Sequence, residues 1–179
     1  MLRIAELIGH ELKWTQPHAT KMEYALCAGD VEAATLRFRS SFGTFATGTS
    51  ADGAWTFKRV GFTQTKVTVR ACEAHVDLAA FKNNTWSGGG TLELPDGRKY
   101  PASTNSWATQ YSFKTEAGDL LICYKKIHGM LHMSSETEIY PIARDMPELP
   151  WMVMLGWYLT IMMYVDSSVM TAAVVTTTS

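Results

Sequence analysis

The best candidate for a binding site in this chain is a short basic cluster. Lys58 and Arg59 stand side by side, and Lys66 and Arg70 follow soon after them. Basic side chains at a surface attract anionic lipid head groups, at about 1 kcal/mol for each residue. These four residues are therefore the candidate ligand-binding residues, with an anionic phospholipid or a protein as partner. The simpler interpretation is that such charges only keep one face of a sheet hydrated.

Histidines and cysteines are present, but their arrangement is not typical of a metal centre. His128 and His132 are four residues apart, which suits two ligands on a helix. The glycine between them and the apolar neighbours favour a strand and a turn instead. Cys27, Cys72 and Cys123 lie far apart, without the close spacing of a zinc or redox motif. We expect no metal and no cofactor.

Signals for catalysis are equally weak. Glu136 and Glu138 alternate along one run and would share a face as a carboxylate pair, yet an exposed strand face explains them as well. No Gly-x-Ser-x-Gly sequence presents a nucleophile. Residues 87–90 lack the Lys and Ser or Thr of a phosphate loop, and we interpret them as a connection or a bulge. Enzymatic activity is left open, and a non-enzymatic role is preferred.

Composition indicates one globular domain over residues 1–179. The chain is 46% hydrophobic and 18% charged, which is typical of a folded protein with one core. A formal net charge of −1 gives no electrostatic attraction to nucleic acid. Sparse, odd-numbered cysteines and an N-terminus without a continuous apolar stretch predict a cytoplasmic protein without a secretory signal.

Short runs of alternating apolar and polar residues fill most of the chain and predict β-strands. About twelve strands are expected between residues 12 and 142. They cover Leu12–Thr15, Lys21–Ala28, Val31–Arg39, Gly43–Thr49, Ala54–Val60, Lys66–Cys72, His75–Lys82, Thr91–Leu94, Arg98–Ala102, Thr109–Thr115, Leu120–Ile127 and Glu136–Ile142. Asp-Gly pairs between the runs favour hairpins and antiparallel pairing.

An apolar segment near the end of the chain completes the fold prediction. Residues 149–165 are apolar on every side until Asp166, and Pro147 and Pro150 suit the start of a helix. Such a helix spans about 25 Å at roughly 1.5 Å per residue, short of a hydrocarbon layer of about 30 Å. No Lys or Arg follows to anchor the far side of a membrane. The expected structure is mostly β, a closed antiparallel barrel around a central helix at 147–165.

Two questions stay open at this end of the chain. The apolar helix could instead be a tail anchor that holds a cytoplasmic β domain at a membrane, although no integral membrane span is expected. Residues 166–179 could extend the helix, add a strand or fray. Gly156 weakens the helix but allows another element to approach its backbone closely. The domain thus consists of an N-terminal segment 1–11, strands over 12–142, the central helix and a tail.

About twelve strands followed by one very hydrophobic helix resemble the tubby C-terminal-like superfamily, which includes the tubby, phospholipid scramblase and LURP-one-related groups. The segments most similar to its small bacterial members are 51–62 (ADGAWTFKRVGF), 91–100 (TLELPDGRKY), 147–151 (PELPW) and 155–159 (LGWYL). The resemblance covers most of the chain. It implies a closed barrel that surrounds a central helix.

What the resemblance implies about function is limited. Tubby proteins bind phosphoinositide head groups through a basic surface, whereas the LURP-one-like and bacterial members are largely without an assigned activity. Lys58, Arg59, Lys66 and Arg70 form the nearest basic cluster here, without a residue-by-residue match to the tubby lipid site. Calcium binding of the scramblase kind needs a run of alternating acidic ligands, which this sequence lacks. We expect a non-enzymatic binding or scaffold module, cytoplasmic or peripheral to a membrane.

Overall fold

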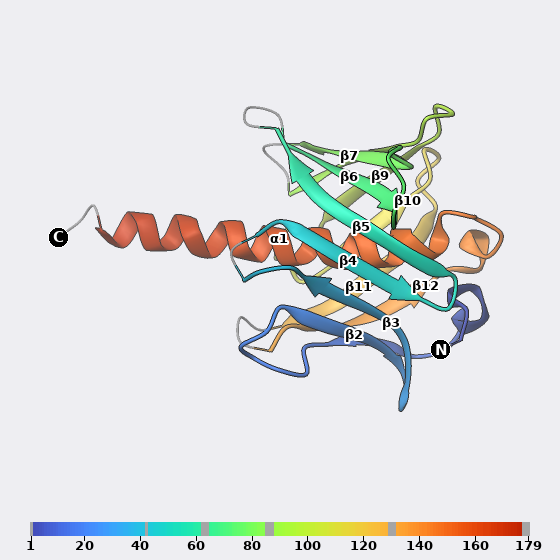
Figure 1. Ribbon diagram of the computed structural model, residues 1–179, viewed down its shortest axis with the longest axis horizontal. Helices are drawn as coiled ribbons and strands as arrows, with labels where there is room; N and C mark the ends of the chain where they lie inside the picture. Colours follow the sequence, from blue (N-terminus) through green and yellow to red (C-terminus); the bar gives the residue numbers. More distant parts are fainter. Residues whose placement is uncertain (1, 42, 62–64, 85–87, 129–131, 177–179) are drawn as a thin grey trace.

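Antiparallel strands, twelve in number, follow one another around a closed barrel. They are β1 (Leu12–Thr15), β2 (Glu23–Ala28), β3 (Val31–Phe38), β4 (Phe45–Ser50), β5 (Gly53–Val60), β6 (Lys66–Ala71), β7 (Ala79–Asn84), β8 (Gly89–Glu93), β9 (Lys99–Thr104), β10 (Tyr111–Lys114), β11 (Leu120–His128) and β12 (Ser134–Ile139). Pairing of β1 with β12 closes the sheet on itself. The computed structural model describes residues 2–41, 43–61, 65–84, 88–128 and 132–176, with side chains as far as Ser167. The predicted class, a mostly β closed barrel, is confirmed (Figure 1).

Alternation along the strands decides which side chains enter the barrel. In β5, Trp55 and Phe57 are buried, whereas Lys58, the residue after Phe57, is exposed. In β6, Val67 and Val69 are likewise buried. Because successive side chains of a strand point to opposite faces, the apolar positions fill the interior and the polar positions face outward.

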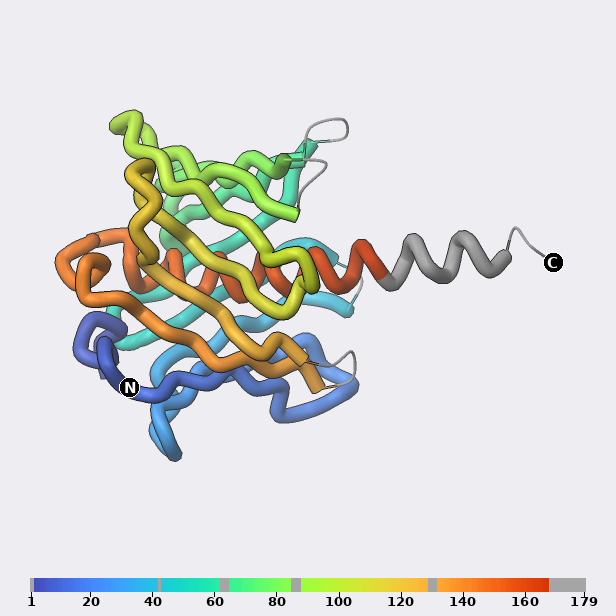
Figure 2. Tube along the Cα trace, turned by 180° about the vertical axis from the view of Figure 1, so that it is seen from behind, coloured from blue at the N-terminus to red at the C-terminus, as the bar shows by residue number. Residues whose placement is uncertain are grey.

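A single long helix, α1 (Leu149–Thr176), runs through the barrel and leaves it at one end, as Figures 1 and 2 show from opposite sides. Every residue from Trp151 to Met162 is buried, and α1 packs against β3, β4, β5, β10 and β11. A helix that is apolar all round needs such an enclosure. The predicted central helix is therefore confirmed. Within the described part of the chain, no helix combines the length and apolar character needed to cross a membrane.

Aromatic rings fix the helix inside the sheet. Trp157 of α1 stacks on Trp14 of β1, with ring centroids 5.8 Å apart. The next residue, Tyr158, stacks on Phe38 of β3 at 5.4 Å. Offset stacking at such distances adds about 0.5–1.5 kcal/mol per pair beyond the burial of apolar area. Two neighbouring helix residues thus hold different parts of the barrel wall.

The helix boundaries differ from the prediction at both ends. It begins at Leu149 rather than at residue 147, and Pro150 falls in its first turn, where a missing N–H costs nothing. It also continues past Val165 to Thr176, because neither Gly nor Pro interrupts the chain after Asp166. Of the three alternatives for residues 166–179, helix extension is the one observed as far as Thr176. Residues 177–179 lie outside the described residues.

Two strand predictions are also corrected. The last strand stops at Ile139 rather than Ile142, because Pro141 lacks an N–H for the ladder and starts a short 3-10 turn, η2 (Pro141–Ala143). The strand expected from His75 begins at Ala79, since Glu73 adopts a positive φ of 67° and the chain turns before β7.

The segment interpreted as a connection or a bulge contributes to a strand. Gly89 and Gly90 open β8, and a Cβ on Gly90 would lie only 2.6 Å from the ring of Phe81. Glycine therefore permits β7 and β8 to come together at this point. Ser87, the first residue of that segment, lies outside the described residues.

The N-terminal segment closes one end of the barrel. It forms a 3-10 turn, η1 (Ile4–Leu7), in which Ile4 and Leu7 are both buried. The backbone N–H of Ile4 donates a hydrogen bond of 2.9 Å to Asp52 in the β4–β5 turn. We call this the closed end, and the opposite end, where α1 leaves, the mouth.

Candidate functional site

Three of the four predicted ligand-binding residues meet on the outer face of β5 and β6. Lys58, Lys66 and Arg70 line a shallow groove of about 220 Å³, which we call the outer groove. The strand register explains why they meet, because Val60 pairs with Lys66 and Lys58 pairs with Thr68, all facing outward. Residues two apart on a strand share a face, so the alternating sequence itself builds this basic surface.

Charge in the outer groove is only partly neutralised. The Nε of Arg70 lies 2.5 Å from a carboxylate oxygen of Asp77, so this guanidinium is paired. Lys58 and Lys66 are exposed and have no acidic partner among the residues that the structure describes. Lys82, which pairs with Lys66 across β6 and β7, is held by Glu93 at 2.5 Å. The surplus positive charge therefore comes from two ammonium groups.

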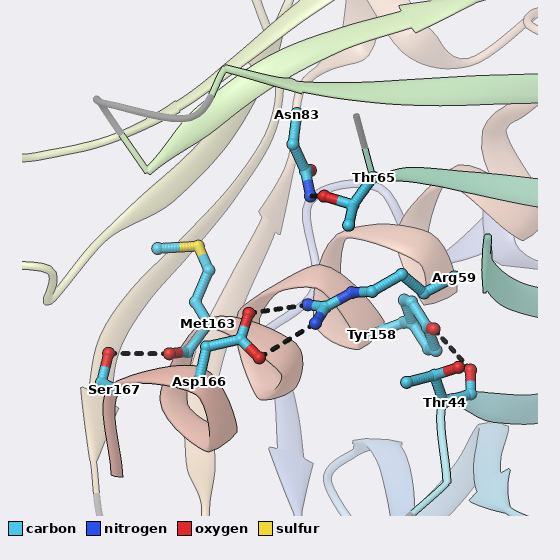
Figure 3. A network of polar contacts seen from close by, with 8 residues as sticks. All are labelled: Thr44, Arg59, Thr65, Asn83, Tyr158, Met163, Asp166 and Ser167. Carbon is cyan, nitrogen blue, oxygen red and sulfur yellow. Dashed lines mark hydrogen bonds and ion pairs between the residues drawn. The ribbon is translucent and has the colours of Figure 1, made fainter. Parts of the chain in front are cut away.

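Arg59, the fourth predicted residue, does not belong to this groove. It alternates to the inner face and reaches Asp166 of α1 at the mouth, with two hydrogen bonds of 2.9 and 2.8 Å (Figure 3). Its hydrogen bonding to Asp166 raises the pKa of the guanidinium, although burial acts in the opposite direction. The structure thus divides the predicted cluster between two faces of the sheet.

Polar contacts surround this ion pair at the mouth. Asn83 donates to the hydroxyl of Thr65 at 3.2 Å, and the Tyr158 hydroxyl donates to the Thr44 carbonyl at 2.5 Å (Figure 3). Beside the ion pair lies a second hollow of about 220 Å³, the mouth cavity. It is lined by Arg59, Thr65, Phe81, Asn83, Asn84, Gly88, Gly89, Tyr111, Leu159, Met162, Met163 and Asp166.

Sequence reasoning did not single out Asp166 or Tyr111 as site residues. One signal for Asp166 was available, because it is the first charged residue after a long apolar helix and so marks where that helix leaves apolar surroundings. Tyr111 gave no such signal, since its position depends on the order of strands around the barrel.

A second ion pair holds the other end of the buried helix. Arg98, in the β8–β9 hairpin, lies 2.5 Å from the carboxylate of Glu148, just before α1. Arg98 also contacts Asp96 at 2.7 Å and the Tyr100 hydroxyl at 3.2 Å. Glu148 is 4% exposed, and its second carboxylate oxygen has no hydrogen bond among the described residues. The buried part of α1 is thus tied to the barrel at both ends.

The possible carboxylate pair is engaged in ion pairs. Glu138 accepts from Lys125 and from Tyr140, and Glu136 accepts from Lys126 at 2.7 Å. The hydrogen bond from Lys125 lowers the pKa of Glu138, which keeps it ionised. A general acid needs a raised pKa, whereas the pKa of Glu138 is lowered. Both carboxylates are held by lysines, as on an exposed strand face.

The histidines that were four residues apart in the sequence have the following positions in the structure. His128 ends β11, and the Nδ1 of His132 lies 3.3 Å from the Gln16 carbonyl. Gly129, which was expected to turn the chain between them, lies outside the described residues. In the part of the chain that the structure describes, no three His, Cys, Asp or Glu side chains gather as metal ligands.

Comparison with known proteins gives no match, whether to protein-family models, to curated proteins or to solved structures.

Proposed function

We propose that the protein is a non-enzymatic binding module whose outer groove docks on anionic lipid head groups. One observation carries this proposal. Lys58 and Lys66 present two exposed ammonium groups to the same groove, without an acidic partner among the described residues. A phosphate oxygen near them would replace water without breaking an existing ion pair.

The location of the groove suits a flat anionic surface. Val60 ends β5 and Lys66 begins β6, and these strand ends lie at the mouth, the end where α1 leaves the barrel (Figure 1). Phe45 lies beside Lys58 in the same groove and adds an apolar contact at the level of the charges. At about 1 kcal/mol per lysine, two lysines contribute roughly a 30-fold preference for anionic over neutral vesicles. Binding of this kind is weak and sensitive to salt.

Vesicle co-sedimentation tests the proposal. The protein should sediment with phosphatidylcholine vesicles that contain phosphatidylserine, and it should stay in the supernatant with phosphatidylcholine alone. The double variant K58E/K66E should lose sedimentation, because two charge reversals replace attraction by repulsion. Raising the salt concentration should weaken binding of the native chain in parallel.

A matched control is K13E/K114E. Lys13 and Lys114 have no ion-pair partner among the described residues, and they lie toward the closed end on β1 and β10. The control has the same net charge as K58E/K66E but should still bind. Indifference to lipid charge, or equal loss in both double variants, would refute a specific role for the outer groove.

A further inference from the structure

We propose that the mouth cavity binds a small amphiphilic anion, a carboxylate that carries a short hydrocarbon chain. The cavity lies on the inner face of the sheet, whereas Lys58 and Lys66 lie on the outer face, so this site is separate from the outer groove. Its volume of about 220 Å³ corresponds to roughly seven water molecules at about 30 Å³ each. The cavity is thus smaller than a drug-sized site and suits a ligand of about eight non-hydrogen atoms.

Arg59 supplies the anion-binding end of the site. Its guanidinium already holds the Asp166 carboxylate through both oxygens, in the bidentate geometry by which Arg binds carboxylates. The side chain of Arg59 is only 20% exposed, whereas that of Asp166 is 56% exposed. The Nε of Arg59 is buried and has no hydrogen bond within the described residues. Asp166 can therefore swing into solvent and leave the guanidinium to a ligand carboxylate.

Tyr111 offers a second polar contact for a ligand. It lines the mouth cavity and is 2% exposed, and no described residue forms a hydrogen bond with its hydroxyl. The hydroxyl oxygen is not among the fully buried atoms that lack a partner, so it opens into the cavity and is available to a ligand there. A ligand carboxylate in the cavity would offer an oxygen to this phenol.

The remaining wall suits a hydrocarbon chain. Phe81 lines the cavity from β7, and Leu159, Met162 and Met163 line it from α1. Methionine side chains are flexible and adapt to ligands of different shape. Polar groups thus meet the head of the ligand and apolar groups meet its tail, which is the usual composition of a small-molecule site.

Titration of the native chain with hexanoate tests the site, followed through the methyl NMR signals of Met162 and Met163. Hexanoate should shift these signals in a saturable manner. Hexanamide, which has the same chain without the charge, should bind at least about tenfold more weakly. Acetate, which lacks the chain, should also bind more weakly. Hexyl phosphate separates the two possible head groups, and binding as tight as that of hexanoate would assign the site to any compact anion rather than to carboxylates.

Three variants locate the ligand. R59Q should abolish saturable binding, and Y111F should weaken it by about three- to tenfold, because one hydrogen bond is lost. D166A should tighten binding, since it removes the carboxylate that competes for Arg59. Thermal melting of each variant, D166A included, shows whether the barrel is intact.

Opposite results would overturn the site. Equal binding of hexanoate and hexanamide would show that Arg59 does not recognise the ligand's charge. Unchanged or weaker binding of hexanoate by D166A would show that Asp166 does not compete with the ligand for Arg59. These measurements do not depend on Lys58 or Lys66. A negative result here would therefore not bear on lipid binding by the outer groove.

Discussion

The ring of Tyr124 lies against the backbone of α1 at Gly156, in the space that any other residue would fill with a Cβ. A Cβ built on Gly156 would approach two ring carbons of Tyr124 to 2.5 and 2.6 Å. The hydroxyl of the same tyrosine donates a buried hydrogen bond of 2.6 Å to the Val153 carbonyl. One side chain of β11 thus fixes both the depth and the rotation of the central helix.

Gly156→Ala should therefore destabilise the protein, although alanine favours a helix by about 1 kcal/mol over glycine. An aromatic ring cannot yield as a flexible side chain would, so the overlap must shift the helix or the strand. We expect a net loss of about 1–3 kcal/mol in the free energy of unfolding, measured by urea denaturation.

A double-mutant cycle isolates this contact. Tyr124→Leu removes the ring carbons that a new Cβ would meet, so Gly156→Ala should cost less in the Y124L background than in the native chain. Additive effects of the two substitutions would mean that the alanine is disfavoured for a reason other than this ring.

Because α1 is enclosed by the barrel, replacing any one of its large buried side chains should lower the free energy of unfolding. Leu155 is 0% exposed, so Leu155→Ala should cost about 2–5 kcal/mol in the free energy of unfolding. Leu155→Asp or Ile161→Asp should prevent folding, because each would bury an unpaired charge. Val165→Ala is the control, since Val165 is 37% exposed and should change stability by less than about 0.5 kcal/mol. A soluble L155D variant that melts cooperatively would contradict the enclosed helix.

Most of the fold could be predicted because its signals are local. Strand alternation and Asp-Gly turns define hairpins, and a run of hairpins that must protect its edges closes into a barrel. The central helix followed from one segment that is apolar on every side. The site was less predictable, because adjacent residues such as Lys58 and Arg59 face opposite sides of a strand. The four basic residues were treated as one surface. Alternation along β5 instead turns Arg59 to the inner face, where it reaches Asp166 at the mouth.

The ion pair between Arg98 and Glu148 gives an asymmetric prediction. Arg98→Ala leaves a carboxylate that is 4% exposed without its cation, whereas Glu148→Gln removes the charge itself. We therefore expect a lower urea midpoint for R98A than for E148Q. Lys99→Ala, in the same hairpin, should leave the midpoint nearly unchanged, because Lys99 lies 3.9 Å from Glu93 and is half exposed. Equal losses in R98A and E148Q would show that the Glu148 carboxylate is well hydrated.

Buried phenols predict a loss of stability in alkaline solution. Burial raises the pKa of Tyr158 to about 12 from an ordinary value of 10, and it also raises the pKa of Tyr111 and Tyr124. Above pH 10 the unfolded chain releases these protons while the folded barrel retains them, so the free energy of unfolding falls as the pH rises. The contribution of Tyr158 is fully present below pH 10 and decreases by about 1.4 kcal/mol per pH unit above it.

Urea denaturation between about pH 8 and pH 11 measures this slope. Tyr158→Phe should lower stability at pH 8, because the hydrogen bond to Thr44 is lost, and should flatten the decline above pH 10. Identical slopes in the native chain and in Y158F would mean that Tyr158 ionises as readily in the folded barrel as in the unfolded chain.

A buried threonine on β12 provides the last prediction. Thr137 is 4% exposed, and its hydroxyl has no hydrogen bond among the described residues, so Thr137→Val replaces an unsatisfied group by a methyl of the same shape. The substitution should be neutral or should stabilise the barrel by up to about 1–3 kcal/mol, because an unmade buried hydrogen bond is costly. Thr160→Val is the matched control: Thr160 is 2% exposed, but its hydroxyl donates to the Gly156 carbonyl at 2.9 Å, so valine there removes a bond that is made. Opposite signs for the two threonines, measured as urea midpoints, would assign the difference to hydrogen bonding, whereas equal destabilisation would show that the Thr137 hydroxyl is satisfied in solution.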